Sequence, residues 1–306
     1  MPAQVRVYAP GSIGNVGPGL DILGLAVAGA GDTVAAERTQ QRGVVIAQAG
    51  HPSLPTDPAR HSSAIAAAGL LRRADAGFGI RIKLEKGLPL SGGQGGSAAS
   101  AVAGALAANF LLDRQLDSTA VLLSALEAEA KVAGRHADNV APSLLGGLVL
   151  IRSLEPLDLV RVPVPPSLRV VLAHPDRKMS TRRARAALPR TVSLAVALHQ
   201  AAQVAAMVSA AHSGDLPLLG RAVDDRIAEP ARAPLLEGFE EAKRAAMGAG
   251  ALGCSISGSG PTVFALVSGD PAGARVADAM RQAYADRGIA CRARVAAADL
   301  EGARAL

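Results

Sequence analysis

The sequence has very few aromatic residues. Tryptophan is absent, and two tyrosines and four phenylalanines make up only 2% of the 306 residues. Apolar residues nevertheless reach 49%, which is ordinary for a globular protein and far above the level of disordered chains. The core must therefore be built from alanine, valine, leucine and isoleucine. At about 150 residues per domain, the length predicts about two domains.

The shortage of aromatic rings also argues against nucleic-acid binding. A net charge of +6 and a pI of 9.9 would by themselves suggest such a partner. The basic residues are scattered, however, with one tight group at Arg182, Arg183 and Arg185, and few rings are present to stack on bases. We expect no nucleic-acid partner, although a mild positive field would help to attract an anionic small molecule.

Cysteine is scarce as well, and no segment has the pattern of a signal peptide. Cys254 and Cys291 are the only cysteines, so neither a disulfide framework nor a zinc site is indicated. The N-terminus lacks the basic-then-apolar pattern of a secretory signal. The apolar runs near 98–112 and 192–211 are interrupted by polar residues, so we predict two buried helices rather than membrane spans. These features predict a cytoplasmic protein with no membrane partner.

Helical and strand patterns mix irregularly along the chain. Apolar residues recur at helical spacing over residues 62–74, 97–112, 118–131, 191–212 and 271–287. The segments "GLAVAG" and "DTVAAER" predict a pair of strands around the turn "AGAGD". Because no βαβ unit repeats, the pattern predicts an α+β fold.

A proline-rich segment divides the chain. "EPLDLVRVPVPPSLRV" contains four prolines, a composition typical of a linker between domains. We therefore predict one domain over residues 1–155 and a second over residues 165–306.

The segment "SGGQGGSAAS", Ser91 to Ser100, places four glycines directly before an alanine-rich helix. The first turn of a helix has unpaired N–H groups and partial positive charge, and a loop without Cβ atoms lets a phosphate approach them. A P-loop is excluded because no lysine follows the glycines, and a dinucleotide fingerprint lacks its first βα unit. The alternative is a flexible turn before a tightly packed helix.

Four further segments carry polar groups suited to binding a small molecule. Val7 to Val27 contains Asn15 and Asp21, and Glu127 to Gly147 contains two glutamates, His136, Asp138 and Asn139. Glu127 and Glu129 are two residues apart, so they cannot share a helix face, and one of them could hold Mg²⁺. Thr181 and Arg185 are one helical turn apart, and Arg232 follows in "DRIAEPARAPLL". The planar guanidinium of arginine suits a carboxylate or phosphate.

Together these segments resemble the GHMP kinase superfamily and, within it, the homoserine kinases. "LPLSGGQGGSAAS" is similar to the superfamily's central ATP loop, and "SGSGPTVFAL" to its C-terminal glycine motif. Four segments are similar to the forms found in homoserine kinases: "APGSIGNVGPGLDILGLAV", "RHADNVAPSLLGG", "STRRARAALP" and "IAEPARAPLL". The resemblance runs from about Val5 to Leu266, with the motifs in the same order.

The resemblance implies a fold and a reaction. The fold is the two-domain α+β fold of GHMP kinases, with an N-terminal ribosomal-S5-like domain that binds ATP and a C-terminal ferredoxin-like domain. The reaction is ATP-dependent phosphorylation of the side-chain hydroxyl of L-homoserine to O-phospho-L-homoserine, a step of threonine biosynthesis. ATP and Mg²⁺ are the implied cofactors, and a homodimer fits the family.

The resemblance also implies roles for individual residues. The triphosphate would bind the loop Pro89, Leu90, Ser91, Gly92, Gly93, Gln94, Gly95, Gly96, Ser97 and Ala98. The metal would be held by Ser97 and Glu129. The substrate pocket would consist of Asn15, Asp21, His136, Asn139, Thr181, Arg185 and Arg232. Asp21 suits the substrate ammonium, and Thr181 and the two arginines suit its carboxylate. Asn139, near the reacting hydroxyl, completes the catalytic set with Ser97 and Glu129.

The sequence departs from the family pattern in two places. The central loop commonly reads G-L-G-S-S, whereas here Q-G-G-S ends at Ser97, so position 96 offers phosphate its backbone alone. His61 stands where an asparagine on the adenine side is expected.

The expected mechanism and two alternative functions follow from the family resemblance. Other branches are described with an aspartate base, whereas Asn139 occupies that region here, so we expect the hydroxyl proton to leave late, to a phosphoryl oxygen. The alternatives are another GHMP small-molecule kinase, such as a mevalonate-type enzyme, or a non-catalytic sensor of the same fold.

Overall fold

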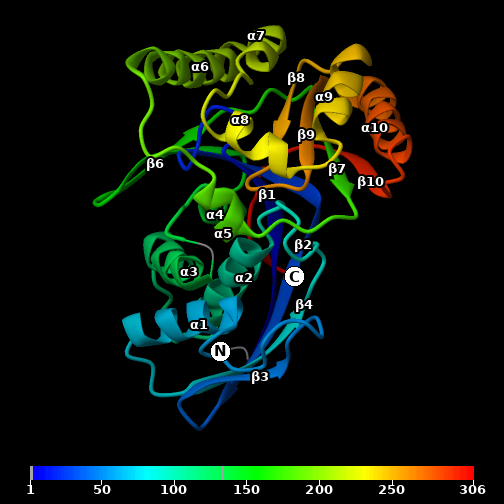
Figure 1. Ribbon diagram of the computed structural model, residues 1–306. Coiled ribbons are helices and arrows are strands. Elements are labelled where there is room, and N and C mark those ends of the chain that lie inside the picture. The colour runs from blue at the N-terminus through cyan, green and yellow to red at the C-terminus, as the bar shows by residue number, and fades with distance from the viewer. Residues whose placement is uncertain (1–2, 133) are drawn as a thin grey trace.

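A computed structural model describes residues 3–132 and 134–306, and it contains two sheets (Figure 1). The strands are β1 (Gln4–Gly14), β2 (Leu23–Thr39), β3 (Gly43–Gln48), β4 (Gly79–Glu85), β5 (Leu148–Leu154), β6 (Leu157–Val162), β7 (Leu168–Pro175), β8 (Gly253–Ile256), β9 (Val263–Ser268), β10 (Cys291–Ala296) and β11 (Arg304–Ala305). The helices are α1 (Ser62–Arg73), α2 (Gly96–Phe110), α3 (Ser118–Val132), α4 (Val140–Leu145), α5 (Thr181–Ala186), α6 (Leu194–Ser213), α7 (Leu216–Arg221), α8 (Ala228–Arg232), α9 (Phe239–Gly248) and α10 (Gly269–Ala285), with a 3-10 turn at Ala233–Leu235.

The first sheet is built around β2. Its strand order is β11-β1-β2-β4-β3, and β5 pairs with both β2 and β6. The predicted pair of strands around "AGAGD" is wrong, because this segment belongs to β2. Gly31 pairs with Pro10, and the register shifts between Pro10 and Gly11. The glycines therefore form an irregularity inside one long strand rather than a hairpin turn.

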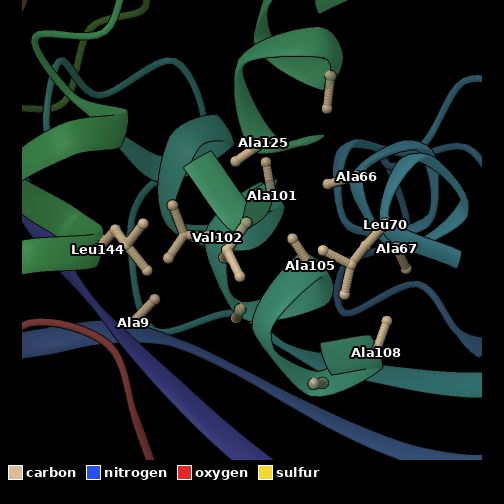
Figure 2. Close-up of a cluster of buried hydrophobic side chains, with 14 of the residues drawn as sticks. Ala9, Ala66, Ala67, Leu70, Ala101, Val102, Ala105, Ala108, Ala125 and Leu144 are labelled. Carbon is tan, nitrogen blue, oxygen red and sulfur yellow. The ribbon is translucent and has the colours of Figure 1, made fainter. Parts of the chain in front are cut away.

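Three helices, α1, α2 and α3, pack on one another through small side chains. Ala101, Ala105 and Ala108 of α2 are fully buried, and Figure 2 shows them between neighbouring alanines and leucines. A Cβ atom at Gly104 would lie 2.2 Å from the carbonyl oxygen of Ser63, so α1 and α2 approach each other more closely than larger residues allow. The prediction of a core without large aromatic side chains is confirmed in this cluster, which contains no buried aromatic residue.

The second sheet is antiparallel, with the order β10-β7-β9-β8. Taken in chain order this is the fourth, first, third and second strand, the arrangement of a ferredoxin-like unit. The chain then returns to the first sheet, where β11 pairs with β1. The last residues of the chain thus belong to the N-terminal sheet. The predicted division at residues 155–165 stays a prediction.

The expectation that residues 192–211 form a buried helix is wrong. Helix α6 lies along one end of the molecule, beside α7 (Figure 1), and only 22% of its most apolar window is buried. Leu194 and Leu198 are 75% and 62% exposed. Among the described residues, α6 is the one helix whose length and apolar composition would allow it to span a bilayer, a test that core helices also pass.

Candidate active site

A cavity of about 1030 Å³ lies between the two sheets and contains most of the predicted site residues. Its wall includes Asn15, Asp21, Pro89, Leu90, Ser91, Gly92, Gly93, Gly95, Gly96, Ser97, Glu129, His136, Asn139, Thr181, Arg185 and Arg232. Of the predicted site residues, Gln94 and Ala98 do not line it. The segments that resemble different family motifs thus meet at one site.

The glycine loop delivers the N-terminus of α2 into this cavity. Gly95 is the N-cap residue, with a φ of 67°, and no side chain caps the helix. The first-turn N–H groups of a helix of 15 residues are therefore available to an anion. Gly93 also has a positive φ, of 72°, a conformation that glycine adopts without strain.

The second glycine loop, Ser257 to Thr262, holds the first loop in place through hydrogen bonds. Ser257 donates a hydrogen bond from Oγ to the carbonyl oxygen of Gly93 at 2.6 Å. The Thr262 hydroxyl donates to the carbonyl oxygen of Gly92 and lies 3.2 Å from the Gln94 side-chain nitrogen. Gln94 therefore binds the neighbouring domain instead of facing the cavity.

Glu129 is a buried carboxylate beside the helix N-terminus. The Ser97 hydroxyl donates to its Oε1 atom at 3.0 Å, while its Oε2 atom is buried and has no hydrogen-bond partner. Burial raises the pKa of Glu129 to about 7 against the effect of the Ser97 hydrogen bond. A buried oxygen without a partner is costly, so this position favours a cation.

Glu127 lies on another face of α3. Its carboxylate forms ion pairs with Arg72, at 2.5 Å, and with Arg73, at 3.1 Å, both on α1. Its hydrogen bonds to these arginines hold its pKa below the ordinary value although burial acts in the opposite direction. Glu129 therefore faces the cavity and Glu127 faces the surface, as their two-residue spacing on one helix predicts.

Asn15 and Asp21 come from a strained turn between β1 and β2. Their φ angles are 69° and 64°, in the left-handed region that asparagine and aspartate tolerate better than most residues. The Asn15 side chain accepts the backbone N–H of Asp21 at 3.1 Å and donates to the carbonyl oxygen of Gly258 at 3.1 Å. The turn is thereby fixed to the second glycine loop.

Arg185 and Asp21 form a bidentate ion pair in the cavity. Both oxygens of the carboxylate accept from the guanidinium at 2.7 Å, and His136 lies beside both groups, 2.7 Å from the same guanidinium. Burial acts to raise the pKa of Asp21, but the Arg185 hydrogen bonds and the charge of His136 hold it below its ordinary value. Burial lowers the pKa of His136. Thr181 lies one helical turn before Arg185 on α5, and its hydroxyl is 3.4 Å from that of Ser259.

Arg232 is a second cation at the same end of the cavity, and it is only 4% exposed. It donates to the carbonyl oxygen of Gly258 at 2.8 Å and to that of Ala184 at 3.3 Å. It forms no ion pair with a carboxylate of the described chain. Burial and the neighbouring Arg185 lower its pKa. A buried guanidinium without a carboxylate partner is a binding group for an anion.

Sequence reasoning missed the support for this pocket. Gln200, the one buried residue in the first half of α6, donates to the carbonyl oxygen of Pro18 and to Asp225, each at 3.0 Å. Asp225 accepts the N–H groups of Ile227 and Ala228 at the start of α8, which carries Arg232. Gln200 thus connects the two substrate-facing segments from behind, and no local pattern could show it.

Asn139 lines the cavity close to the glycine loop, since a Cβ atom at Gly95 would lie 3.0 Å from its Oδ1 atom. Its Oδ1 atom accepts from the Ser12 hydroxyl at 3.0 Å, which leaves its amide nitrogen free of that contact. The neighbouring Asp138 accepts the backbone N–H of Asn15 at 3.1 Å and is 3% exposed. Burial and the charge of Asp21 raise the pKa of Asp138 to about 7. The sequence showed Asp138 only as part of a polar loop.

A buried ion pair lies under the glycine loop. Lys86 pairs with Asp32, whose side chain is fully buried, and donates to the carbonyl oxygen of Gly96 at 3.1 Å. The hydroxyl of Ser100 donates to the same carboxylate at 2.6 Å. This network, also unpredicted, fixes the first turn of α2.

His61 does not replace an adenine-binding asparagine in the expected way. It is 2% exposed, and both ring nitrogens have protein partners, the carbonyl oxygen of Ala49 at 3.2 Å and the Ser63 hydroxyl at 2.9 Å. Burial lowers its pKa. The ring therefore orders the start of α1.

Comparisons with known proteins identify the family. The GHMP kinases N-terminal domain matches residues 62–147, and the GHMP kinases C-terminal domain matches residues 207–286. The homoserine kinase of Chlorobium phaeobacteroides is 41% identical over 293 residues, which are 92% of each chain. That of Arabidopsis thaliana is also 41% identical, over 92% of this chain and 78% of the relative.

Solved structures agree. The homoserine kinase of Cytophaga hutchinsonii is 39% identical, covers 100% of this chain and 98% of its own, and superposes with a TM-score of 0.95. The mevalonate kinase of L. major, at 17% identity, covers 94% of this chain and 95% of its own, and shares the fold with a TM-score of 0.67. The chain belongs to the GHMP kinases and, within them, to the homoserine kinase family.

Proposed function

We propose that this kinase transfers the γ-phosphoryl group of ATP to the side-chain hydroxyl of L-homoserine, giving O-phospho-L-homoserine for threonine biosynthesis. The observation that carries the proposal is that one acid, Asp21, and two arginines, Arg185 and Arg232, line the same cavity as the α2 N-terminus. We further propose a cytoplasmic enzyme, because its two cysteines are unpaired and disulfides are rare in a reducing compartment.

ATP would lie with its phosphates against the first turn of α2. The loop from Gly92 to Ser97 supplies backbone N–H groups there, and position 96 contributes no side chain that could block them. Phosphoryl transfer requires chiefly positioning and stabilisation of negative charge, which uncapped N–H groups provide. The adenine end would be read without His61, whose ring is already engaged.

Ser97 and Glu129 are the residues that would hold Mg²⁺. The unpartnered, buried Oε2 atom of Glu129 and the adjacent hydroxyl form a donor set of oxygen atoms, which is the set that Mg²⁺ prefers. When bound, the ion would neutralise charge on the phosphates. Glu127 is committed to surface ion pairs and is unsuited to this role.

The substrate's three polar groups have matching partners in the cavity. Its ammonium would bind Asp21 and the Asn15 side chain, its carboxylate would bind Arg185, Arg232 and the Thr181 hydroxyl, and His136 would complete the wall. Asn139 would hold the reacting hydroxyl through its amide. An amide takes no proton, so the hydroxyl proton would pass to a phosphoryl oxygen as the new P–O bond forms and the bond to ADP breaks.

ADP release should be measured with ATP and Mg²⁺ across L-homoserine, L-threonine, L-serine, mevalonate and galactose. We expect turnover with L-homoserine, and Arg232→Ala should raise its KM by about 30-fold or more while the KM for ATP changes little, because a buried charge partner is lost. Arg183→Ala, on exposed α5 surface, is the matched control. Preference for mevalonate would overturn the substrate assignment, and saturable ATP binding without turnover would favour a sensor.

We also propose a homodimer in which α6 covers α6 of a second copy. No aspartate, glutamate, lysine or arginine occurs from Thr191 to Ala211, and Leu194 and Leu198 are exposed between small alanines. Small residues let two helices approach closely, and an apolar face of this kind is usual at an interface.

The oligomeric state tests this assignment. Light scattering should give twice the 30.8 kDa chain mass for the wild type and the monomer mass for Leu198→Glu. Val45→Glu, which places the same charge on an exposed valine of β3, should remain dimeric. A monomeric wild type would contradict the proposal, and binding of phosphatidylcholine vesicles that Leu198→Glu abolishes would assign the face to a membrane.

A further inference from the structure

The two groups assigned to opposite charges of the substrate are bound to each other. The Asp21 carboxylate and the Arg185 guanidinium share two hydrogen bonds of 2.7 Å, and each side chain is about one-third exposed. Such a bidentate pair satisfies both partners with good geometry. While the pair holds, the charge of each group is compensated by the other.

We propose that Asp21 and Arg185 form a clasp that a zwitterionic amino acid opens and that a ligand with a single charge does not. The proposal rests on the proposed function, which assigns the substrate ammonium to Asp21 and its carboxylate to Arg185. A zwitterion replaces one internal ion pair with two ion pairs to the ligand. The clasp therefore selects for the presence of both charges on one molecule.

Two neighbouring side chains, Arg232 and His136, keep their own contacts while the ligand replaces the internal ion pair. Arg232 is held by two backbone carbonyl oxygens and has no carboxylate partner in the described chain, so it can receive an anion without releasing anything. His136 contacts the Arg185 guanidinium and lies 3.5 Å from the Asp21 carboxylate. The ring remains beside both groups whichever partner they bind.

A ligand with one charge that binds either member of the clasp leaves the other member without a partner. If 4-hydroxybutanoate takes Arg185, the Asp21 carboxylate loses its two strongest hydrogen bonds in a partly buried site. If 3-aminopropan-1-ol takes Asp21, the guanidinium is left instead. Removing one partner of a partly buried ion pair costs more than the pair itself contributes. Each half of the substrate should therefore bind far more weakly than its own contacts suggest.

The clasp makes a prediction that simple complementarity does not. Asp21→Asn removes the group assigned to the ammonium and frees Arg185. It should therefore weaken the binding of L-homoserine and strengthen the binding of 4-hydroxybutanoate. Asparagine suits this position because it tolerates the φ of 64° as well as aspartate does. Arg185→Gln frees Asp21 instead, so it should strengthen the binding of 3-aminopropan-1-ol.

Titration calorimetry with the whole enzyme measures both effects. For Asp21→Asn we expect the Kd of L-homoserine to rise by about tenfold or more and that of 4-hydroxybutanoate to fall by about fivefold relative to wild type. Asp176→Asn removes the same charge from the cavity wall, where Asp176 forms no ion pair with the described residues. It should leave the 4-hydroxybutanoate Kd within about twofold.

The outcomes separate the clasp from the proposed function. Wild type that binds L-homoserine, with no gain for 4-hydroxybutanoate in Asp21→Asn and none for 3-aminopropan-1-ol in Arg185→Gln, overturns the clasp alone. An equal gain in Asp176→Asn also overturns it, because general charge would then explain the effect. Wild type that neither binds nor phosphorylates L-homoserine overturns both.

Discussion

Glu129→Gln is expected to lower kcat by about 100-fold or more with little effect on the fold. Glutamine keeps the size of the side chain and can still accept the Ser97 hydrogen bond, but it removes the negative charge and replaces one carboxylate oxygen with an NH2 group, which cannot bind a cation. Since the buried Oε2 atom has no protein partner, no contact within the protein is lost. The loss of activity should come with a raised Mg²⁺ requirement, measured by ADP release across a magnesium titration.

Glu127→Gln is the matched control for this experiment. It makes the same chemical change two residues away, where the carboxylate serves ion pairs with Arg72 and Arg73 on α1. Because half-exposed ion pairs contribute little, we expect full kcat and a loss of stability of about 1 kcal/mol or less. Retained kcat and unchanged magnesium dependence in Glu129→Gln, or an equal loss in Glu127→Gln, would show that the metal assignment is wrong.

Local patterns in the sequence predict the segments that make the site, because the chemistry of each is local. Four glycines before a helix leave its N–H groups open whatever surrounds them, and the structure confirms an uncapped N-terminus with Gly95 in the left-handed region. Two-residue spacing likewise predicts that Glu127 and Glu129 face different ways. The predicted GHMP kinase fold and homoserine kinase membership are confirmed by the comparisons.

Contacts between distant segments could not be predicted in this way. Gln200 reaches a carbonyl oxygen 182 residues away at Pro18, and Lys86, directly after β4, reaches Asp32 on the neighbouring strand β2. Neither residue stands in a motif that reports its partner. The role of Gln94 was misplaced for the same reason, since its partner Thr262 lies in the other domain.

The burial of α6 was predicted wrongly because composition does not distinguish two kinds of apolar helix. A core helix and a helix with an exposed apolar face have the same excess of alanine and leucine. The long strand β2 was divided for a related reason. "AGAGD" has the residues of a turn, but pairing with β1 holds them in the sheet. In both cases a neighbour that the local sequence does not contain decides the structure.

Gly93→Ala should disable the enzyme through the joint between its two glycine loops. Gly93 has a φ of 72°, and a Cβ atom there would lie 2.6 Å from the carbonyl oxygen of Ser257 and 2.8 Å from that of Gly260. Both obstacles are backbone atoms of the C-terminal domain, so the loops must separate. The left-handed conformation adds about 1 kcal/mol of strain for alanine, and displacement of the loop also moves the N-terminus of α2, where we propose that the phosphates bind.

We therefore expect Gly93→Ala to raise the KM for ATP by about tenfold or more and to lower the melting temperature by a few degrees, at about 2 °C per kcal/mol. Gly96→Ala is the control within the same loop. Its Cβ would meet no backbone atom closer than 3.5 Å, the nearest atom being Lys86 Nζ at 3.2 Å, and its φ is ordinary. Kinetics and thermal denaturation should therefore show a near-normal enzyme. If alanine at position 96 is as damaging as at position 93, bulk beside the phosphates and not the joint between the loops governs the site; if neither matters, ATP does not bind against this loop.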